Sequence, residues 1–192
     1  MKQNALLIIF ALALMNVSAQ TNAWQQNETL PGFYLGIQSG VESFTGLIGL
    51  TADFRLKDNF FIRAGAGIGS WGGKLSVGIR NEKSSGKGIG YGIYISQATG
   101  LKDFTTKLET TDGNKDVNMD LQPGLTLNPV ISYKWMINNK NRFFVEGGYA
   151  VPLQSLPYKI RDGSELTDTS KRVMKILCPG GLSLGLGFQF AL

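Results

Sequence analysis

Histidine is missing from this chain of 192 residues, and cysteine occurs once, as Cys178. Catalytic triads and dyads that work through an imidazole need a histidine, and structural zinc sites are built from histidine and cysteine. Because histidine is missing and only one cysteine is present, both kinds of site are excluded, so we predict no cofactor, no metal and no enzymatic activity. Charged residues are also scarce, at 17% against about a quarter in average proteins.

Long apolar runs are equally scarce. A single basic residue, Lys2, precedes an apolar stretch at residues 5–15 and a small-residue sequence that ends at Ala19. This order is typical of a cleavable secretory signal peptide. We therefore predict a signal peptide at 1–19, a short segment at 20–29 and one domain at 30–192. No later run approaches the roughly 20 apolar residues of a spanning helix. The net charge of +5 is dispersed, so we predict no nucleic-acid partner.

Glycine is abundant, with 25 residues, and from residue 30 onward apolar residues alternate with glycine or polar residues. From Leu182 to Leu192, every even position is leucine or phenylalanine, and the odd positions are serine, glycine, glutamine or alanine. A period of two is the pattern of a β-strand with two different faces. Eight segments show it: 32–39, 45–56, 59–70, 73–80, 88–97, 121–136, 142–152 and 182–192.

The charged residues fall on the glycine-rich face of these segments. In a soluble barrel that face is the wet exterior, whereas in a membrane barrel it lines the lumen and the apolar face meets lipid. The connections favour the membrane barrel, because the two longest, 98–120 and 153–181, fall at the same end. We therefore predict an all-β fold, an eight-stranded antiparallel up-and-down transmembrane barrel.

The lumen of an eight-stranded barrel has little more room than its own side chains need, and confined charges require partners. We predict a charge network that plugs the lumen, formed by Asp53, Arg55, Arg63, Lys134 and Glu146. An ion path lined by the same residues is the alternative.

Aromatic residues of the apolar face gather at the predicted inner ends of the strands. Rings favour the headgroup level of a membrane, so we predict an aromatic girdle there. Its members are Phe33, Phe54, Phe60, Tyr91, Tyr133, Trp135, Phe143 and Phe190. Trp71 and Tyr149 are expected in a sparser band near the outer rim.

The secretory start, the eight alternating segments and the apolar last strand resemble the small OmpA/OmpX-like outer-membrane β-barrel family of Gram-negative bacteria, a porin-like domain. The resemblance covers residues 30–192 and is one of pattern, without a sharp motif. It implies a location in the outer membrane, with outer-membrane lipid, lipopolysaccharide and the outer-membrane insertion machinery as partners. The family usually ends in an aromatic residue, whereas this chain ends in Phe190-Ala191-Leu192.

Two motifs have simple structural interpretations. Residues 67–72 match GxGxxG, but nucleotide binding needs a helix after the motif, and the following residues alternate as a strand. We therefore expect a hairpin tip. Cys178 lacks a partner for an internal disulfide and is expected in or just after the last long loop. An intermolecular bridge or a reactive thiol is the alternative.

The two long loops hold the remaining candidates. Asp162 with Glu165 or Asp168 could do acid–base chemistry, but nothing in the sequence positions these carboxylates, so we expect them to be solvated. The basic cluster of Lys171, Arg172 and Lys175 is a candidate contact for lipopolysaccharide phosphates, and a solvated loop surface is the alternative.

The function predicted from these features is a non-enzymatic structural or surface-interaction role through extracellular loops. Two alternatives stay open. One is a small pore of low conductance for ions or small solutes. The other is a soluble periplasmic or secreted barrel of lipocalin type, which would bind a small apolar ligand inside.

Overall fold

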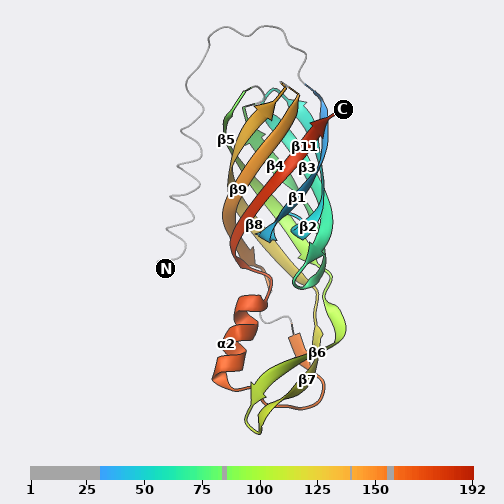
Figure 1. Ribbon diagram of the computed structural model, residues 1–192, viewed down its shortest axis with the longest axis vertical. Coiled ribbons are helices and arrows are strands. Elements are labelled where there is room, and N and C mark those ends of the chain that lie inside the picture. The colour runs from blue at the N-terminus through green and yellow to red at the C-terminus, as the bar shows by residue number, and fades with distance from the viewer. Residues whose placement is uncertain (1–30, 84–85, 139, 155–157) are drawn as a thin grey trace.

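The computed structural model describes residues 31–83, 86–138, 140–154 and 158–192. The predicted signal peptide and the segment 20–29 lie outside the described residues. Eight long strands form a closed barrel, and a smaller sheet and a helix stand beyond one end of it (Figure 1). No helix among the described residues is long and apolar enough to cross a membrane.

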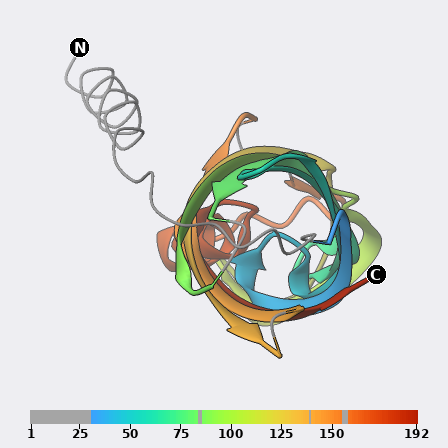
Figure 2. The same ribbon diagram turned by 90° about the horizontal axis from the view of Figure 1, so that it is seen from above.

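The barrel strands follow the predicted segments closely. They are β1 (Phe33–Ser43), β2 (Gly46–Lys57), β3 (Phe60–Gly69), β4 (Gly72–Glu82), β5 (Gly88–Ala98), β8 (Gly124–Ile137), β9 (Asn141–Pro152) and β11 (Gly181–Ala191). Each strand pairs antiparallel with its neighbours, in the order β1-β11-β9-β8-β5-β4-β3-β2. The ring closes because β1 pairs with β2 on one side and with β11 on the other, as the view from above shows (Figure 2). This confirms the predicted up-and-down barrel.

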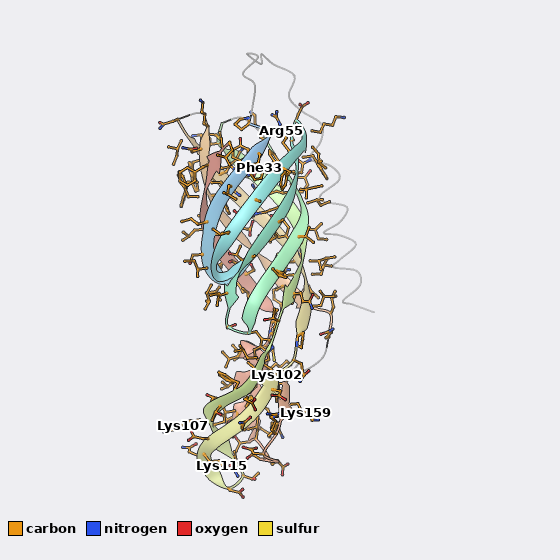
Figure 3. The ribbon with its side chains drawn as sticks, turned by 90° about the vertical axis from the view of Figure 1, so that its right-hand side faces the viewer. Phe33, Arg55, Lys102, Lys107, Lys115 and Lys159 are labelled. Atoms are coloured by element: carbon orange, nitrogen blue, oxygen red, sulfur yellow. The ribbon has the colours of Figure 1, made fainter. Side chains whose placement is uncertain are left out.

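The two faces of the strands differ in the way that a membrane barrel requires. In β11, Leu182 and Leu184 are 64% and 52% exposed on the outside, whereas Ser183 and Gln189 are 2% and 0% exposed inside. Figure 3 shows one side of the barrel, with side chains projecting outward from the strands. An apolar exterior around a polar interior is the reverse of a soluble barrel. It also contradicts the lipocalin alternative, because an apolar ligand needs an apolar interior.

The two ends of the barrel are unlike. The short β2–β3 turn and the C-terminus lie at one end, which we call the inner end (Figure 1). At the other, outer end stand β6 (Leu101–Thr110), β7 (Gly113–Leu121), β10 (Tyr158–Ile160) and α2 (Asp168–Leu177). We call these four elements the cap. Strands β6, β7 and β10 form one antiparallel sheet.

The cap corrects the expectation of two open loops. Apolar side chains from both long connections share one small core, which the loop interpretation overlooked. The core consists of Trp71, Ala98, Val117, Met119, Leu121, Leu166 and Met174. Trp71 is another correction, because it lies 3% exposed in this core instead of in a band at the rim. Its indole Nε1 donates to the carbonyl of Gln122 over 3.0 Å. Tyr149 is exposed on the outside of β9, as expected.

The β1–β2 turn is folded into the lumen. The Ser76 hydroxyl donates to the carbonyl of Phe44 over 2.5 Å, and the Phe44 ring centroid lies 4.6 Å from that of Tyr94. A Cβ at Gly65 would come 2.5 Å from the Phe44 ring, so glycine is needed there for a close approach. The GxGxxG residues span the end of β3, a tight turn and the start of β4. No helix follows them, which confirms the hairpin tip.

Candidate functional site

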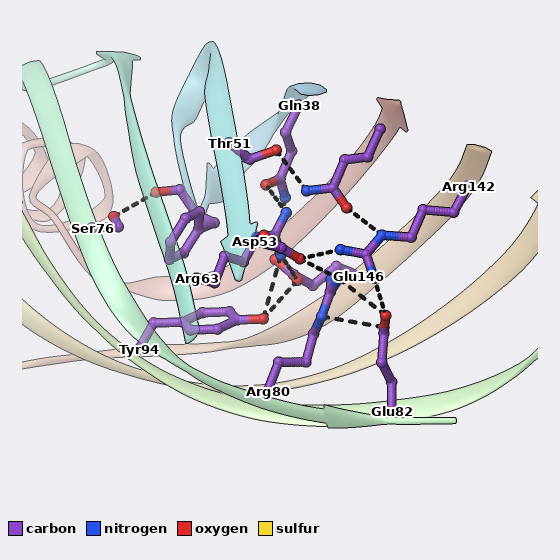
Figure 4. A network of polar contacts seen from close by, with 12 residues as sticks. Gln38, Thr51, Asp53, Arg63, Ser76, Arg80, Glu82, Tyr94, Arg142 and Glu146 are labelled. Carbon is purple, nitrogen blue, oxygen red and sulfur yellow. Dashed lines mark hydrogen bonds and ion pairs between the residues drawn. The ribbon is translucent and has the colours of Figure 1, made fainter. Parts of the chain in front are cut away.

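A cluster of charged side chains lies inside the lumen (Figure 4). Its carboxylates are Asp53 on β2, Glu82 on β4 and Glu146 on β9; its cations are Arg63 on β3, Arg80 on β4, Lys134 on β8 and Arg142 on β9. Each of these side chains is at most 1% exposed. Three carboxylates therefore face four cations, which leaves one net positive charge in a space closed off from bulk solvent.

Asp53 is the centre of the cluster. Its carboxylate lies 3.3 Å from Nε of Arg63 and 2.5 Å from Nη2 of Arg80, and it also contacts Arg142. Asp53 and Arg63 are direct register partners on β2 and β3, so the strand pairing itself places them together. A buried carboxylate needs such partners because it has lost its hydration.

The other two carboxylates extend the network across the lumen. Arg63 Nη1 reaches Oε2 of Glu146 at 2.7 Å. Arg80 Nε lies 3.2 Å from Oε2 of Glu82, which Arg142 also contacts and which Lys134 approaches at 3.7 Å. The cluster therefore ties β2, β3, β4, β8 and β9 together.

Neutral side chains complete the hydrogen bonding. Gln38 Nε2 donates to Glu146 over 3.1 Å and its Oε1 accepts from Arg63 over 2.9 Å. The Tyr94 hydroxyl donates to Glu146 over 3.2 Å. On the other side, Gln189 Oε1 accepts from Arg142 Nε over 2.6 Å. These amides and the hydroxyl fix the orientation of the charged groups.

Aromatic rings enclose the guanidinium groups. The Arg63 guanidinium lies 4.6 Å from the Phe44 ring centroid and 4.8 Å from that of Phe144, and the Arg142 guanidinium lies 3.9 Å from that of Tyr34. Stacking of a cation on a ring face is favourable, most of all away from water. Ions and rings together fill the interior that eight strands enclose.

Of the predicted network, the structure brings Asp53, Arg63, Lys134 and Glu146 together. It does not include Arg55, which is half-exposed near the inner end (Figure 3) and has no ion pair within the described part of the chain. At the mouth of the lumen a guanidinium stays hydrated and needs no carboxylate.

Sequence reasoning missed Arg80, Glu82 and Arg142 as members of the network. Glu82 belongs to the same face as Arg80, two positions away, but it was assigned to a connection. Arg142 shares its face with Glu146, four positions later on β9. Extending the period of two beyond 80 would have found Glu82. Arg142 already belongs to the predicted segment 142–152, and applying the same period there places it on the face of Glu146.

The eight predicted girdle residues lie on the outer face and are exposed or half-exposed. The ring centroids of Phe33 and Phe54 lie 4.6 Å apart. The ring centroid of Trp135 lies 4.6 Å from that of Tyr133 and 5.6 Å from that of Phe143. Phe33 lies near the inner end in Figure 3. The remaining members are Phe60, Tyr91 and Phe190.

Two of the three candidate carboxylates of the cap, those of Asp162 and Asp168, have structural partners. Asp162 accepts the backbone N–H groups of Asn118 and Ser164, over 3.1 and 3.0 Å. These hydrogen bonds stabilise the anion and lower the pKa of Asp162, which does not suit a general acid. Asp168 lies in the first turn of α2, 3.8 Å from Lys171 Nζ. Glu165 is exposed, and its backbone carbonyl accepts from Thr111 N. Across the described ranges, no group of residues is arranged to hold a metal ion.

Cys178 ends α2 and is half-buried against the core of the cap. Burial raises the pKa of its thiol, which lowers the fraction of reactive thiolate at neutral pH. The basic residues Lys171, Arg172 and Lys175 are all exposed on α2. The sequence placed these three basic residues in a loop, whereas they belong to an ordered helix, and Cys178 is the residue that follows it.

Comparison with known proteins finds no matching family model and no matching curated protein. The chain is similar to the crystal structure of Acinetobacter baumannii CarO, with 11% identity, a TM-score of 0.42, and coverage of 87% of this chain and all of that one. The A. baumannii CarO2 structure gives 12% identity and a TM-score of 0.36, covering 86% of this chain and all of that one. What this chain can do is therefore inferred from its own residues.

Proposed function

We propose that this protein is an integral barrel of the Gram-negative outer membrane, with a non-enzymatic structural or surface-interaction role carried by the cap. The observation that supports this most strongly is the apolar outer face of the closed barrel, exemplified by Leu184 at 52% exposure. Water would leave this surface unfavourably solvated, whereas hydrocarbon matches it.

The filled lumen supports a structural role over a pore. Arg63, Arg80, Tyr94 and Phe144 are among the largest fully buried side chains, and all lie inside the barrel. Wide aqueous channels occur in barrels of about 16 strands, because eight strands leave no comparable space. In planar bilayers we expect no steady conductance. A steady current that Arg63→Ala or Glu146→Ala abolishes would contradict the plug.

The cap supports an interaction role. It is a small folded unit on a rigid scaffold, with Lys102, Lys107, Lys115 and Lys159 projecting from its strands (Figure 3). Binding sites commonly occur on segments that a rigid scaffold presents.

The membrane location is tested by fractionation and labelling. The protein should stay in the envelope fraction until detergent is added, and its recovery without detergent would refute the proposal. In a Cys178→Ser background, Thr111→Cys at the tip of the cap should react with an impermeant maleimide on intact cells. The matched control, Asp58→Cys in the β2–β3 turn, should not.

Assembly through the outer-membrane insertion machinery is part of the same proposal. The last strand carries Phe188 and Phe190, whose rings lie 4.8 Å apart, and these provide aromatic character near the end of the chain. Replacing both by alanine should lower the amount of assembled barrel in the envelope, while transcript levels stay constant. Unchanged assembly would argue against recognition through these rings.

The absence of enzymatic activity is also testable. Lipid A profiles of cells with and without the protein should be identical. A new or missing acyl chain would overturn this part of the proposal.

A further inference from the structure

Helix α2 has an apolar arc that the cap covers only in part. Ser170 and Met174 point into the cap and are buried. On the adjoining flank Val173, Ile176 and Leu177 are 42%, 79% and 48% exposed. At 100° per residue these three positions lie side by side along the helix. The helix thus presents an apolar strip that nothing in the described structure covers.

At 100° per residue, Lys171 and Lys175 lie on the side of α2 opposite the strip, and Arg172 lies beside Ile176. Lys171, Arg172 and Lys175 are exposed, and the first-turn Asp168 is the acidic residue of the helix. Basic and bulky apolar residues on different sides of one helix suit a membrane interface. Because α2 runs roughly along the long axis of the molecule in Figure 1, its C-terminal end is the part that comes near the barrel. The pattern therefore fits a surface that is both anionic and apolar.

The apolar strip lies close along the chain to the apolar outer face of the barrel. Three residues, 178–180, connect Leu177 to Gly181, the first residue of β11. A connection of that length spans at most about 14 Å. The next residue, Leu182, is already exposed on the apolar face of the barrel. In Figure 1 the C-terminal end of α2 is the end nearer the barrel, and Figure 2 shows the helix at the edge of the ring.

We propose that the C-terminal half of α2 inserts its strip of Val173, Ile176 and Leu177 into the outer leaflet, where Lys171, Arg172 and Lys175 bind the phosphates of lipopolysaccharide. This inference rests on the proposed function, because it needs the barrel in a membrane. Two observations carry it, the short connection between the strip and the lipid-facing strand β11, and the match between the cations and an anionic headgroup layer. The cap is then held against the membrane.

The experiment places a fluorescent probe at single cysteines in the Cys178→Ser protein. The three sites are Ile176→Cys on the strip, Leu184→Cys on the barrel wall and Thr111→Cys at the tip of the cap. Each labelled protein is reconstituted in vesicles of lipopolysaccharide and phosphatidylcholine with a nitroxide-labelled lipid as quencher. We expect strong quenching at Leu184 and Ile176 and none at Thr111. Quenching at Ile176 no greater than at Thr111 would overturn the inference.

The cations are tested by replacement. The triple variant Lys171→Gln, Arg172→Gln and Lys175→Gln should weaken partition of the helix into the anionic interface on the order of a hundredfold, with loss of quenching at Ile176. The control replaces three cap cations elsewhere, Lys102, Lys107 and Lys159, and should leave the quenching unchanged.

The remaining outcomes separate the two proposals. Quenching at Ile176 that persists in the triple variant, or that is equal in pure phosphatidylcholine, refutes lipopolysaccharide as the occupant. Quenching that is absent at Leu184 refutes the membrane barrel itself. Quenching at Leu184 without quenching at Ile176 refutes the helix insertion alone. A partner protein that covers the strip instead of lipid would also refute it.

Discussion

Replacement of Asp53 by asparagine should destabilise the barrel strongly. Asp53 is fully buried and contacts Arg63, Arg80 and Arg142, so the change leaves three guanidinium groups to share Glu82 and Glu146. The net charge of the cluster rises from one to two positive charges. Removing one partner of a buried ion pair costs about 3–5 kcal/mol, and asparagine keeps the shape, so we expect a loss of that size.

Urea unfolding of the protein in lipid vesicles at pH 7 measures this loss. With a slope of about 1–3 kcal/mol per molar urea, the midpoint should fall by roughly 1 M or more. The control is Arg55→Gln at the mouth of the lumen, which should stay within about 0.5 kcal/mol of the parent.

A double variant shows whether charge balance is the cause. Adding Arg63→Gln to Asp53→Asn returns the cluster to one net positive charge, so the double variant should lose less than the sum of the two single losses. A loss below about 1 kcal/mol for Asp53→Asn, or strict additivity in the double variant, would refute this account of the lumen.

Three further changes test other parts of the molecule. Gly65→Ala places a Cβ 2.5 Å from the Phe44 ring and should lower the free energy of unfolding in urea by roughly 1–3 kcal/mol. The control is Gly147→Ala, whose Cβ would point outward and lie 3.7 Å from Leu184 Cδ2, so it should be neutral. Equal losses in the two variants would contradict an inward-folded β1–β2 turn. Trp71→Ala empties the cap core and should cost the cap about 3–5 kcal/mol, seen as faster protease cleavage within 98–124. The pKa of Asp162 is lowered in the folded cap, so its ionised carboxylate stabilises the cap at pH values above the unfolded pKa of about 3.9. This stabilisation is lost as the pH falls through the lower pKa of the folded state. Asp162→Asn should therefore reduce the loss of amide protection in the cap as the pH falls below about 4, when exchange rates are corrected for the intrinsic rate at each pH. An unchanged acid-induced loss of protection would contradict this assignment.

The barrel was predictable because its signal is local. A strand with one lipid face and one lumen face repeats every two residues, and each residue reports its own environment, as Leu184 and Ser183 do. The same parity places Asp53 and Arg63 inside. The inward course of the β1–β2 turn was not predictable, because it depends on the space that Gly65 leaves on another strand.

The cap was not predictable for a similar reason. Its core joins Trp71 from a hairpin tip with Val117 and Met174 from two connections that are far apart in the sequence. Each connection alone has mixed charge and short apolar stretches, which is also the composition of a solvated loop. Their apolar residues become a core only when the barrel brings both connections to the same end.

The sequence by itself determined the number of barrel strands, the face that their residues occupy and the absence of imidazole chemistry, because these follow from residue identity and from a period of two. Only the tertiary structure decided which ions meet in the lumen, with Arg80, Glu82 and Arg142 included and Arg55 left outside. It also decided that the two long connections fold together and leave one flank of α2 bare. The physical reason is that pairing between distant residues depends on strand register and on the space between side chains, which no local pattern encodes.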